Sequence, residues 1–111
     1  MECAVITTND DCPVACNLNG MTAEQRERHI ALLQLLRGSV EQTTELPAGY
    51  EFRYAGGADT FMAAAEFITL ESLCCSFFHF CLEQEPTDSA ITIRITGPVE
   101  AKPIIVAALQ N

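Results

Sequence analysis

The chain has 111 residues, of which 49% are hydrophobic and 19% charged, a composition ordinary for one globular domain with a single core. Its 15 acidic and 6 basic residues give a net charge of −9, and the basic residues are dispersed along the sequence. Because neutralising phosphates requires clustered lysine and arginine, this balance argues against a nucleic-acid partner.

The first residues, MECAVITTNDD, contain neither a basic segment nor an apolar stretch of signal-peptide length. The longest apolar runs are too short to cross a bilayer, so we expect a cytoplasmic protein with no membrane partner. This expectation bears on the 6 cysteines. Because the cytosol keeps thiols reduced, a cytoplasmic location favours free thiols, metal ligands or redox chemistry over a disulfide framework.

The first predicted helix covers residues 21–38, after an irregular, cysteine-containing arm. Thr22 and Gln25 have the spacing of a capping box, and Gly38 stands where a left-handed C-terminal residue is expected. His29 falls at the boundary of the apolar stripe. That predicted stripe consists of Ile30, Leu32, Leu33 and Leu36.

Two strands and a second helix are predicted next. In YEFRY, Glu51 and Arg53 alternate with aromatic residues, which predicts a strand with one solvated face, and VEQTTEL is its expected hairpin partner. The second helix runs from Ala58 to about Cys74, with Asp59 or Thr60 as its N-cap. Its expected apolar line is Phe61, Ala65 and Ile68, extended by Ser72 and Cys75.

The last third of the chain predicts two more strands and a short helix. In the first strand, Phe78, Phe80 and Leu82 point to one face, whereas His79, Cys81 and Glu83 point to the other. AITIRITG alternates isoleucine with polar residues, and Pro103 fits only the first turn of the last helix.

The order is therefore helix, hairpin, helix, hairpin, helix. Short turns imply antiparallel strand pairs, and the helices must cover one apolar sheet face. We expect one α+β domain over residues 1–111, a two-layer sandwich preceded by an arm over residues 1–20.

The pair Cys74-Cys75 lies where a helix is expected to end and a strand to begin. Adjacent cysteines rarely bond to each other, but at such a junction both sulfur atoms can point toward one ion, and thiolates are the ligands that select zinc, copper(I) and heavier thiophilic ions. The preceding acidic Glu71 disfavours a free thiolate and favours a bound cation. The alternative is that both cysteines are small buried apolar residues.

Cys12 and Cys16 stand at C-x3-C spacing, and Cys16 precedes the cap of the first helix by six residues. We expect Cys16, Cys74 and Cys75 to converge as a three-sulfur site. Cys12 is a candidate fourth ligand. The alternative is that the thiols of the arm are incidental.

The sequence gives less support to a site that includes His79 and Cys81, or to hydrolytic chemistry. The strand assignment places His79 and Cys81 on a solvated face, which suits exposed residues better than ligands convergent with Cys75. A nucleophile pair of Cys75 and His79 is conceivable, because a neighbouring imidazolium activates a thiol. No GxSxG, HExxH or P-loop spacing occurs.

The stretch ITLESLCCSFFHFCLEQEP, followed by ITIRITGPVEAK, resembles a group of small, largely uncharacterised bacterial proteins with an E-x-x-C-C-P-F-x-x-F core. ACNLNGMTAEQRERHIALLQLL and LPAGYEFRY resemble the same group's cysteine-containing start, first helix and Gly-Tyr strand, so the resemblance covers nearly the whole domain from Cys16 on. Related segments occur near, or fused to, mercury-resistance-type regulators, which implies thiophilic metal handling by association.

Two departures from that group bear on the site. Ser76 stands where the group usually has proline, which relaxes the backbone and lets the helix run on. Cys12 and Cys81 are additional to the pattern. The residues that match it are Cys16, Glu71, Cys74, Cys75, Phe77 and Phe80.

We therefore expect a non-enzymatic protein that binds a soft metal or metalloid ion, such as zinc, mercury, arsenite or copper(I), through thiolates. Two alternatives stay open. One is a thiol-redox or thiol-transfer enzyme with Cys75 or Cys74 as nucleophile, and the other is an interaction module with structural cysteines. A homodimer through a sheet edge or an apolar helix face is a further expectation.

Overall fold

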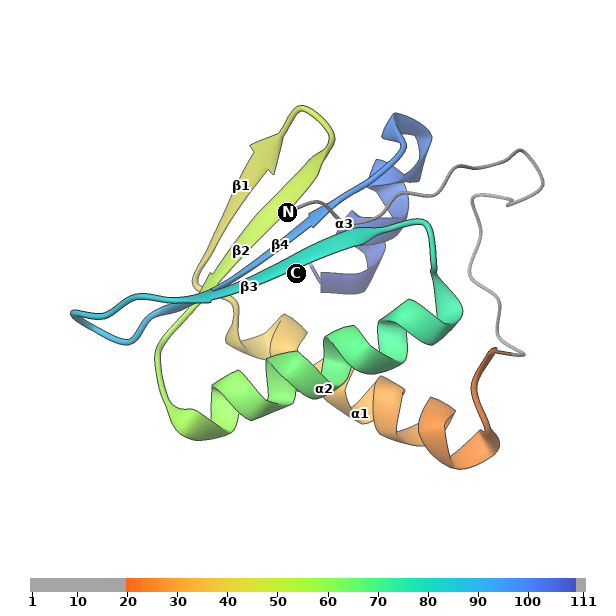
Figure 1. Ribbon diagram of the computed structural model, residues 1–111, viewed down its shortest axis with the longest axis horizontal. Helices are drawn as coiled ribbons and strands as arrows, with labels where there is room; N and C mark the ends of the chain where they lie inside the picture. Colours follow the sequence, from red (N-terminus) through yellow and green to blue (C-terminus); the bar gives the residue numbers. More distant parts are fainter. Residues whose placement is uncertain (1–19, 110–111) are drawn as a thin grey trace.

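The computed structural model describes residues 20–109, which form helices and strands in the predicted order (Figure 1). None of the helices in this range is long and apolar enough to span a membrane. The elements are α1 (Ala23–Ser39), β1 (Gln42–Leu46), β2 (Gly49–Tyr54), α2 (Ala58–Cys74), β3 (His79–Gln84), β4 (Ile91–Thr96), a 3₁₀ turn (Val99–Ala101) and α3 (Lys102–Leu109).

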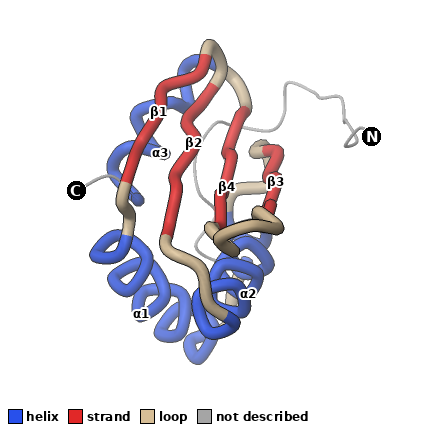
Figure 2. The backbone as a smooth tube through the Cα atoms, turned by 90° about the vertical axis from the view of Figure 1, so that its left-hand side faces the viewer, coloured by secondary structure: helices blue, strands red, loops and turns tan. Residues whose placement is uncertain are grey.

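The four strands form one antiparallel sheet in the order β1-β2-β4-β3 (Figure 2). The two hairpins are joined through β2 and β4, whose register pairs Phe52 with Ile93, and Ile93 in turn pairs with Leu82 of β3. These side chains define the inner face of the sheet. α2 contacts β3 and β4, α3 contacts β2, and α1 packs against α2 and α3. The predicted α+β class is confirmed.

The outer face of the sheet is polar, as the alternation in YEFRY and ITIRIT predicted. Arg94 Nε lies 3.2 Å from Glu51 Oε1, and Arg94 Nη2 lies 3.4 Å from Glu83 Oε1. Arg53 reaches Asp88 at 3.1 Å. A row of ion pairs therefore crosses three strands on the face opposite the core.

The prediction for α1 is correct at its start, wrong at its end, and correct for only part of its stripe. The capping box of Thr22 and Gln25 is present, but the helix continues through Gly38 to Ser39. Its buried residues are His29, Leu32 and Leu36, whereas Ile30 is 53% exposed. The buried stripe is rotated relative to the predicted one, because it includes His29. A polar residue was not expected at a core position.

The bounds of α2 agree with the prediction, but its buried face does not. Phe61, Ala65 and Ile68 are only partly buried, and the N-cap is Gly57 rather than Asp59 or Thr60. Because α2 is apolar on most of its sides, periodicity alone does not select the face that meets the core. The face that does so comprises Ala63, Ala64, Phe67, Leu70, Glu71 and Cys74.

Tyr54 places a phenolic oxygen in the core. The residue is fully buried, and the described residues offer its hydroxyl no hydrogen-bond partner. Burial raises the pKa of Tyr54, because the phenolate loses its hydration inside the protein.

Replacing Tyr54 by Phe is therefore expected to stabilise the fold by about 1 kcal/mol at pH 7, since a buried unpaired hydroxyl is removed. The advantage should grow above pH ~10. There the unfolded wild-type chain ionises Tyr54, whereas the folded protein, whose pKa is raised, keeps the proton and so loses relative stability. Urea denaturation at pH 7 and pH 10.5 measures both effects. A variant less stable than wild type at pH 7 would show that the hydroxyl is bonded.

Candidate functional site

The cysteine pair lies at the C-terminal end of α2. Cys74 is the last helical residue, and Cys75 is the C-cap, whose backbone N–H donates to the carbonyl oxygen of Glu71 at 2.7 Å. The helix does not run on at Ser76, where the chain instead turns toward β3. The predicted position of the pair at a junction between elements is thus confirmed.

Both sulfur atoms of the pair are inside the protein. Cys74 is 4% exposed and Cys75 is fully buried, and their Sγ atoms lie 3.8 Å apart, so they are not bonded to each other. Cys75 is disulfide-bonded. Any role of its sulfur as a ligand therefore concerns the reduced protein. The two residues belong to the same buried cluster as Met21, which immediately precedes the cap of α1.

A buried contact between a histidine and a glutamate lies on the same last turns of α2. His29 Nε2 of α1 lies 2.5 Å from Glu71 Oε1, and the two residues are 8% and 5% exposed. The His29 ring also stacks on Phe67, with centroids 5.6 Å apart and planes 12° from parallel. The pair joins α1 to α2 one turn before Cys75.

Sequence reasoning missed this pair. It noted Glu71 as a charge near the thiols and expected His29 at the boundary of its stripe. A signal was present, because His29 precedes Leu32 by three residues and Leu36 by seven, which is the spacing of one helix face. What the sequence did not contain was the identity of its partner, 42 residues away.

The other predicted ligands, Cys12 and Cys16, lie outside the described residues. Within residues 20–109, no three histidine, cysteine or acidic side chains are grouped as a metal site would require. α1 and α2 run antiparallel, so the start of α1 and the end of α2 lie at the same end of the molecule (Figure 1). The described chain therefore begins on the side where the cysteine pair lies.

His79 and Cys81 occupy the outer face of β3, as predicted. His79 is exposed and Cys81 is half-buried, with Cys81 Sγ 3.7 Å from His79 Nε2. Their neighbours Phe80 and Leu82 point to the inner face, toward the core that holds Cys75. The strand thus separates His79 from Cys75, which removes the geometric basis for a nucleophile pair of these two residues.

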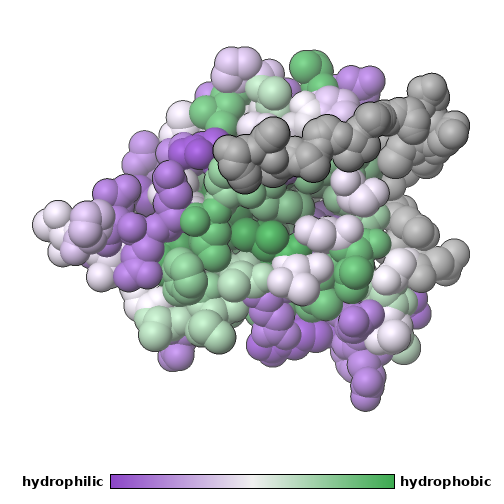
Figure 3. All heavy atoms as spheres, viewed as in Figure 1, coloured by the Kyte–Doolittle hydropathy of each residue, from purple (hydrophilic) through white to green (hydrophobic). Residues whose placement is uncertain are grey.

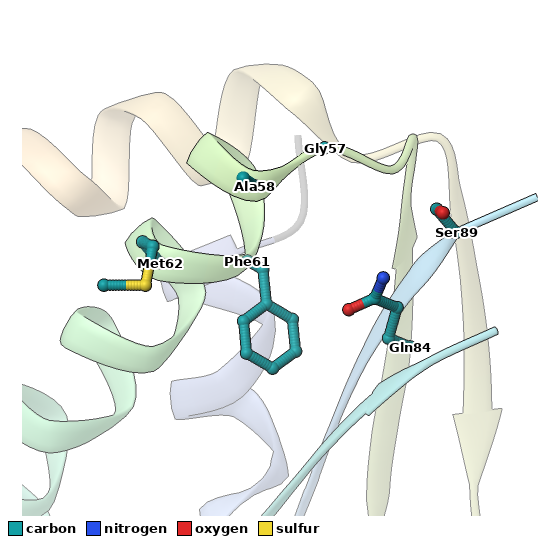
Figure 4. Close-up of a pocket in the computed structure, with 6 residues that line it drawn as sticks. All are labelled: Gly57, Ala58, Phe61, Met62, Gln84 and Ser89. Carbon is teal, nitrogen blue, oxygen red and sulfur yellow. The ribbon is translucent and has the colours of Figure 1, made fainter. Parts of the chain in front are cut away.

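A shallow pocket lies at the opposite end of α2 (Figure 4). It contains no titratable side chain, and the 17 residues of α2 place it about 25 Å from the cysteine pair. It offers no acid, base or thiolate for the chemistry considered above. Its lining residues are Gly57, Ala58, Phe61, Met62, Gln84 and Ser89.

Replacing Glu71 by Ala is expected to lower the free energy of unfolding by about 2 kcal/mol, because the buried His29 ring then loses its hydrogen-bond partner. The matched control is Glu66→Ala, which breaks an exposed ion pair between the same two helices, Arg28 to Glu66 at 2.8 Å, and should cost less than about 1 kcal/mol. Urea denaturation measures both variants. Equal, small losses would show that the buried pair does not hold the helices together.

No family model, curated protein or solved structure matches this chain. The resemblance drawn from the sequence therefore stays an expectation. The geometric feature of this chain that bears most on its function is the buried cysteine pair at the end of α2.

Proposed function

We propose that the reduced protein binds one soft metal or metalloid ion through the thiolates of Cys16, Cys74 and Cys75, with Cys12 as a candidate fourth ligand. The observation that carries this proposal is the 3.8 Å between the sulfur atoms of Cys74 and Cys75. Two thiolates bound to one tetrahedral zinc ion, each at about 2.3 Å, lie about 3.8 Å apart. The pair therefore has the spacing of two ligands of one ion already in the described structure, in which Cys75 is disulfide-bonded.

The electrostatics of the helix end also favour a cation there. The unpaired carbonyl groups at the C-terminus of a helix carry a partial negative charge, and α2 has no basic residue in its last turn to neutralise it. Two thiolates at this position repel each other and the helix end. A bound cation removes both penalties, so deprotonation of the thiols and ion binding are expected to occur together.

The packing of α1 against α2 supports the participation of Cys16. The described chain begins at the helix end that carries the cysteine pair, and Met21 lies in the same buried cluster as Cys74 and Cys75. Cys16 precedes Met21 by five residues, a separation that an extended chain spans in about 17 Å or less. A third ligand from this segment is therefore compatible with the described fold.

Burial favours ion binding over thiol transfer. A nucleophilic thiol must meet its substrate, yet Cys75 is fully buried and Cys74 is 4% exposed. A structural metal site, in contrast, is closed and needs no access for a substrate. The burial of both thiols therefore fits ion binding better than covalent catalysis.

The proposal predicts that reduced, anaerobically purified protein takes up one zinc, mercury(II) or arsenite per chain, measured by native mass spectrometry. Cys74→Ser and Cys75→Ser should each weaken binding by roughly 100-fold or more, because each removes a ligand. Cys81→Ser, which changes a thiol on the outer sheet face, is the matched control and should leave uptake unchanged. Affinity should rise between pH 6 and pH 8, since the ligands must lose protons.

Circular dichroism identifies any variant that fails to fold, and Cys75→Ala then replaces Cys75→Ser as the test of that ligand. Protein oxidised before the titration should take up no ion and should regain uptake on reduction. Full uptake by both Cys74→Ser and Cys75→Ser, or by the oxidised protein, would contradict the proposal. Loss of uptake in Cys16→Ser is the specific expectation for the third ligand.

A further inference from the structure

The two edges of the sheet differ in how they are protected. On β1, Glu45 lies in register with Tyr50 on the inner face, and Lys102 Nζ binds its carboxylate at 2.6 Å. An inward-pointing charge is a common device against edge-to-edge pairing. On the inner face of β3 the corresponding residues are Phe80 and Leu82, which are apolar, and β3 contains no proline.

The backbone of β3 presents hydrogen-bonding groups to this open edge. The N–H of Glu85 donates to the carbonyl of Ala90 at 2.8 Å, and such pairs alternate along antiparallel strands. The N–H and C=O groups of Phe80, Leu82 and Gln84 therefore point away from β4. Within residues 20–109, β3 is the last strand on this side of the sheet.

Apolar surface continues beside the same edge. On the face shown in Figure 3, apolar side chains form a band between β3 and α2. Phe80 and Leu82 are only partly buried, while Met62 and Leu73 of α2 are 66% and 43% exposed. An open strand edge bordered by apolar side chains is a surface that gains stability when another strand covers it.

We propose that β3 pairs antiparallel with β3 of a second copy of the chain, with Cys81 opposite Cys81 of the second copy. This register places His79 opposite Glu83 on the outer face and Phe80 opposite Leu82 on the inner face. The backbone N–H and C=O groups of Phe80 and Leu82, which point away from β4, then form about four hydrogen bonds across the two-fold axis. Two four-stranded sheets become one continuous sheet.

The polar side chains of β3 support this occupant, because the hydrogen-bonding groups of the strand are complementary to themselves. The imidazole of His79 is a hydrogen-bond donor, and the carboxylate of Glu83 accepts several hydrogen bonds, one of them already from Arg94. The two-fold axis forms the His79–Glu83 pair twice. A shift by two residues in either direction would place Glu83 opposite Cys81 or Phe77 instead. The inference does not depend on the proposed metal site, which uses other cysteines at the other end of the turn before β3.

Analytical ultracentrifugation of the full-length, reduced protein tests the pairing. Wild type should sediment with twice the monomer mass in a concentration-dependent manner. Cys81→Glu should raise the dissociation constant by roughly tenfold or more, because it places two carboxylates opposite each other at the axis. The variant should still fold, since position 81 lies in register with Arg94.

The matched control is Gln42→Glu, which adds the same charge on the outer face of the other edge strand, in register with Arg53, and should leave the dimer unchanged. Oxidation by copper–phenanthroline then tests the register. In a pair without backbone hydrogen bonds the Cα atoms of the two Cys81 residues lie about 4.5 Å apart, within disulfide range. A covalent dimer that Cys81→Ser cannot form is expected.

Three outcomes would overturn the proposal. The first is a wild-type protein that stays monomeric at every concentration, which would show that β3 does not pair with β3 of a second copy. The second is a dimer that Cys81→Glu does not weaken, which would place the interface elsewhere. The third is a dimer that Gln42→Glu weakens equally, which would indicate a general effect of charge.

Discussion

The antiparallel contact between α1 and α2 is the constraint on which the site depends. It is held inside the protein by His29 and Glu71 and on the surface by Arg28 and Glu66. A buried polar contact has a demanding geometry, because each side chain loses its hydrogen bonds to water and must replace them with the other. Because His29 lies on α1 and Glu71 on the last turns of α2, this contact ties the end of α2 to α1.

That last turn decides what the two cysteines can do. The main-chain carbonyl of Glu71 accepts the N–H of Cys75 in the last i→i−4 bond of the helix, and the chain then turns toward β3. Both sulfur atoms then lie in the core at a separation that suits two ligands of one ion. If the helix continued regularly through Cys75, the side chains of Cys74 and Cys75 would project about 100° apart around its axis. The end of the helix, rather than the CC dipeptide, makes the pair convergent.

The sheet divides the remaining chemistry between two faces. Isoleucine and aromatic residues of β2 and β4 face the helices, while arginine and glutamate form ion pairs across the strands on the other side. Cys81 belongs to the second environment and Cys75 to the first, although the two are only six positions apart in the sequence. Successive side chains of a strand point to opposite faces of the sheet, so cysteines that are close in the sequence can lie in unrelated environments. The cysteine-rich stretch is thus a buried pair followed by a separate residue at a sheet edge.

The sequence by itself determined the order of the elements, the bounds of α2, the capping box of Thr22 and Gln25, and the junction position of Cys74 and Cys75. These features follow from local chemistry, namely alternation, helix caps and turn residues, which act over a few residues. Only the tertiary structure decided which face of each helix is buried, that His29 meets Glu71, and that β2 and β4 join the two hairpins. Such contacts join residues far apart in the chain, and for helices as apolar as α2 several faces satisfy the local pattern equally. The choice among them is made by the partner that packs against each face.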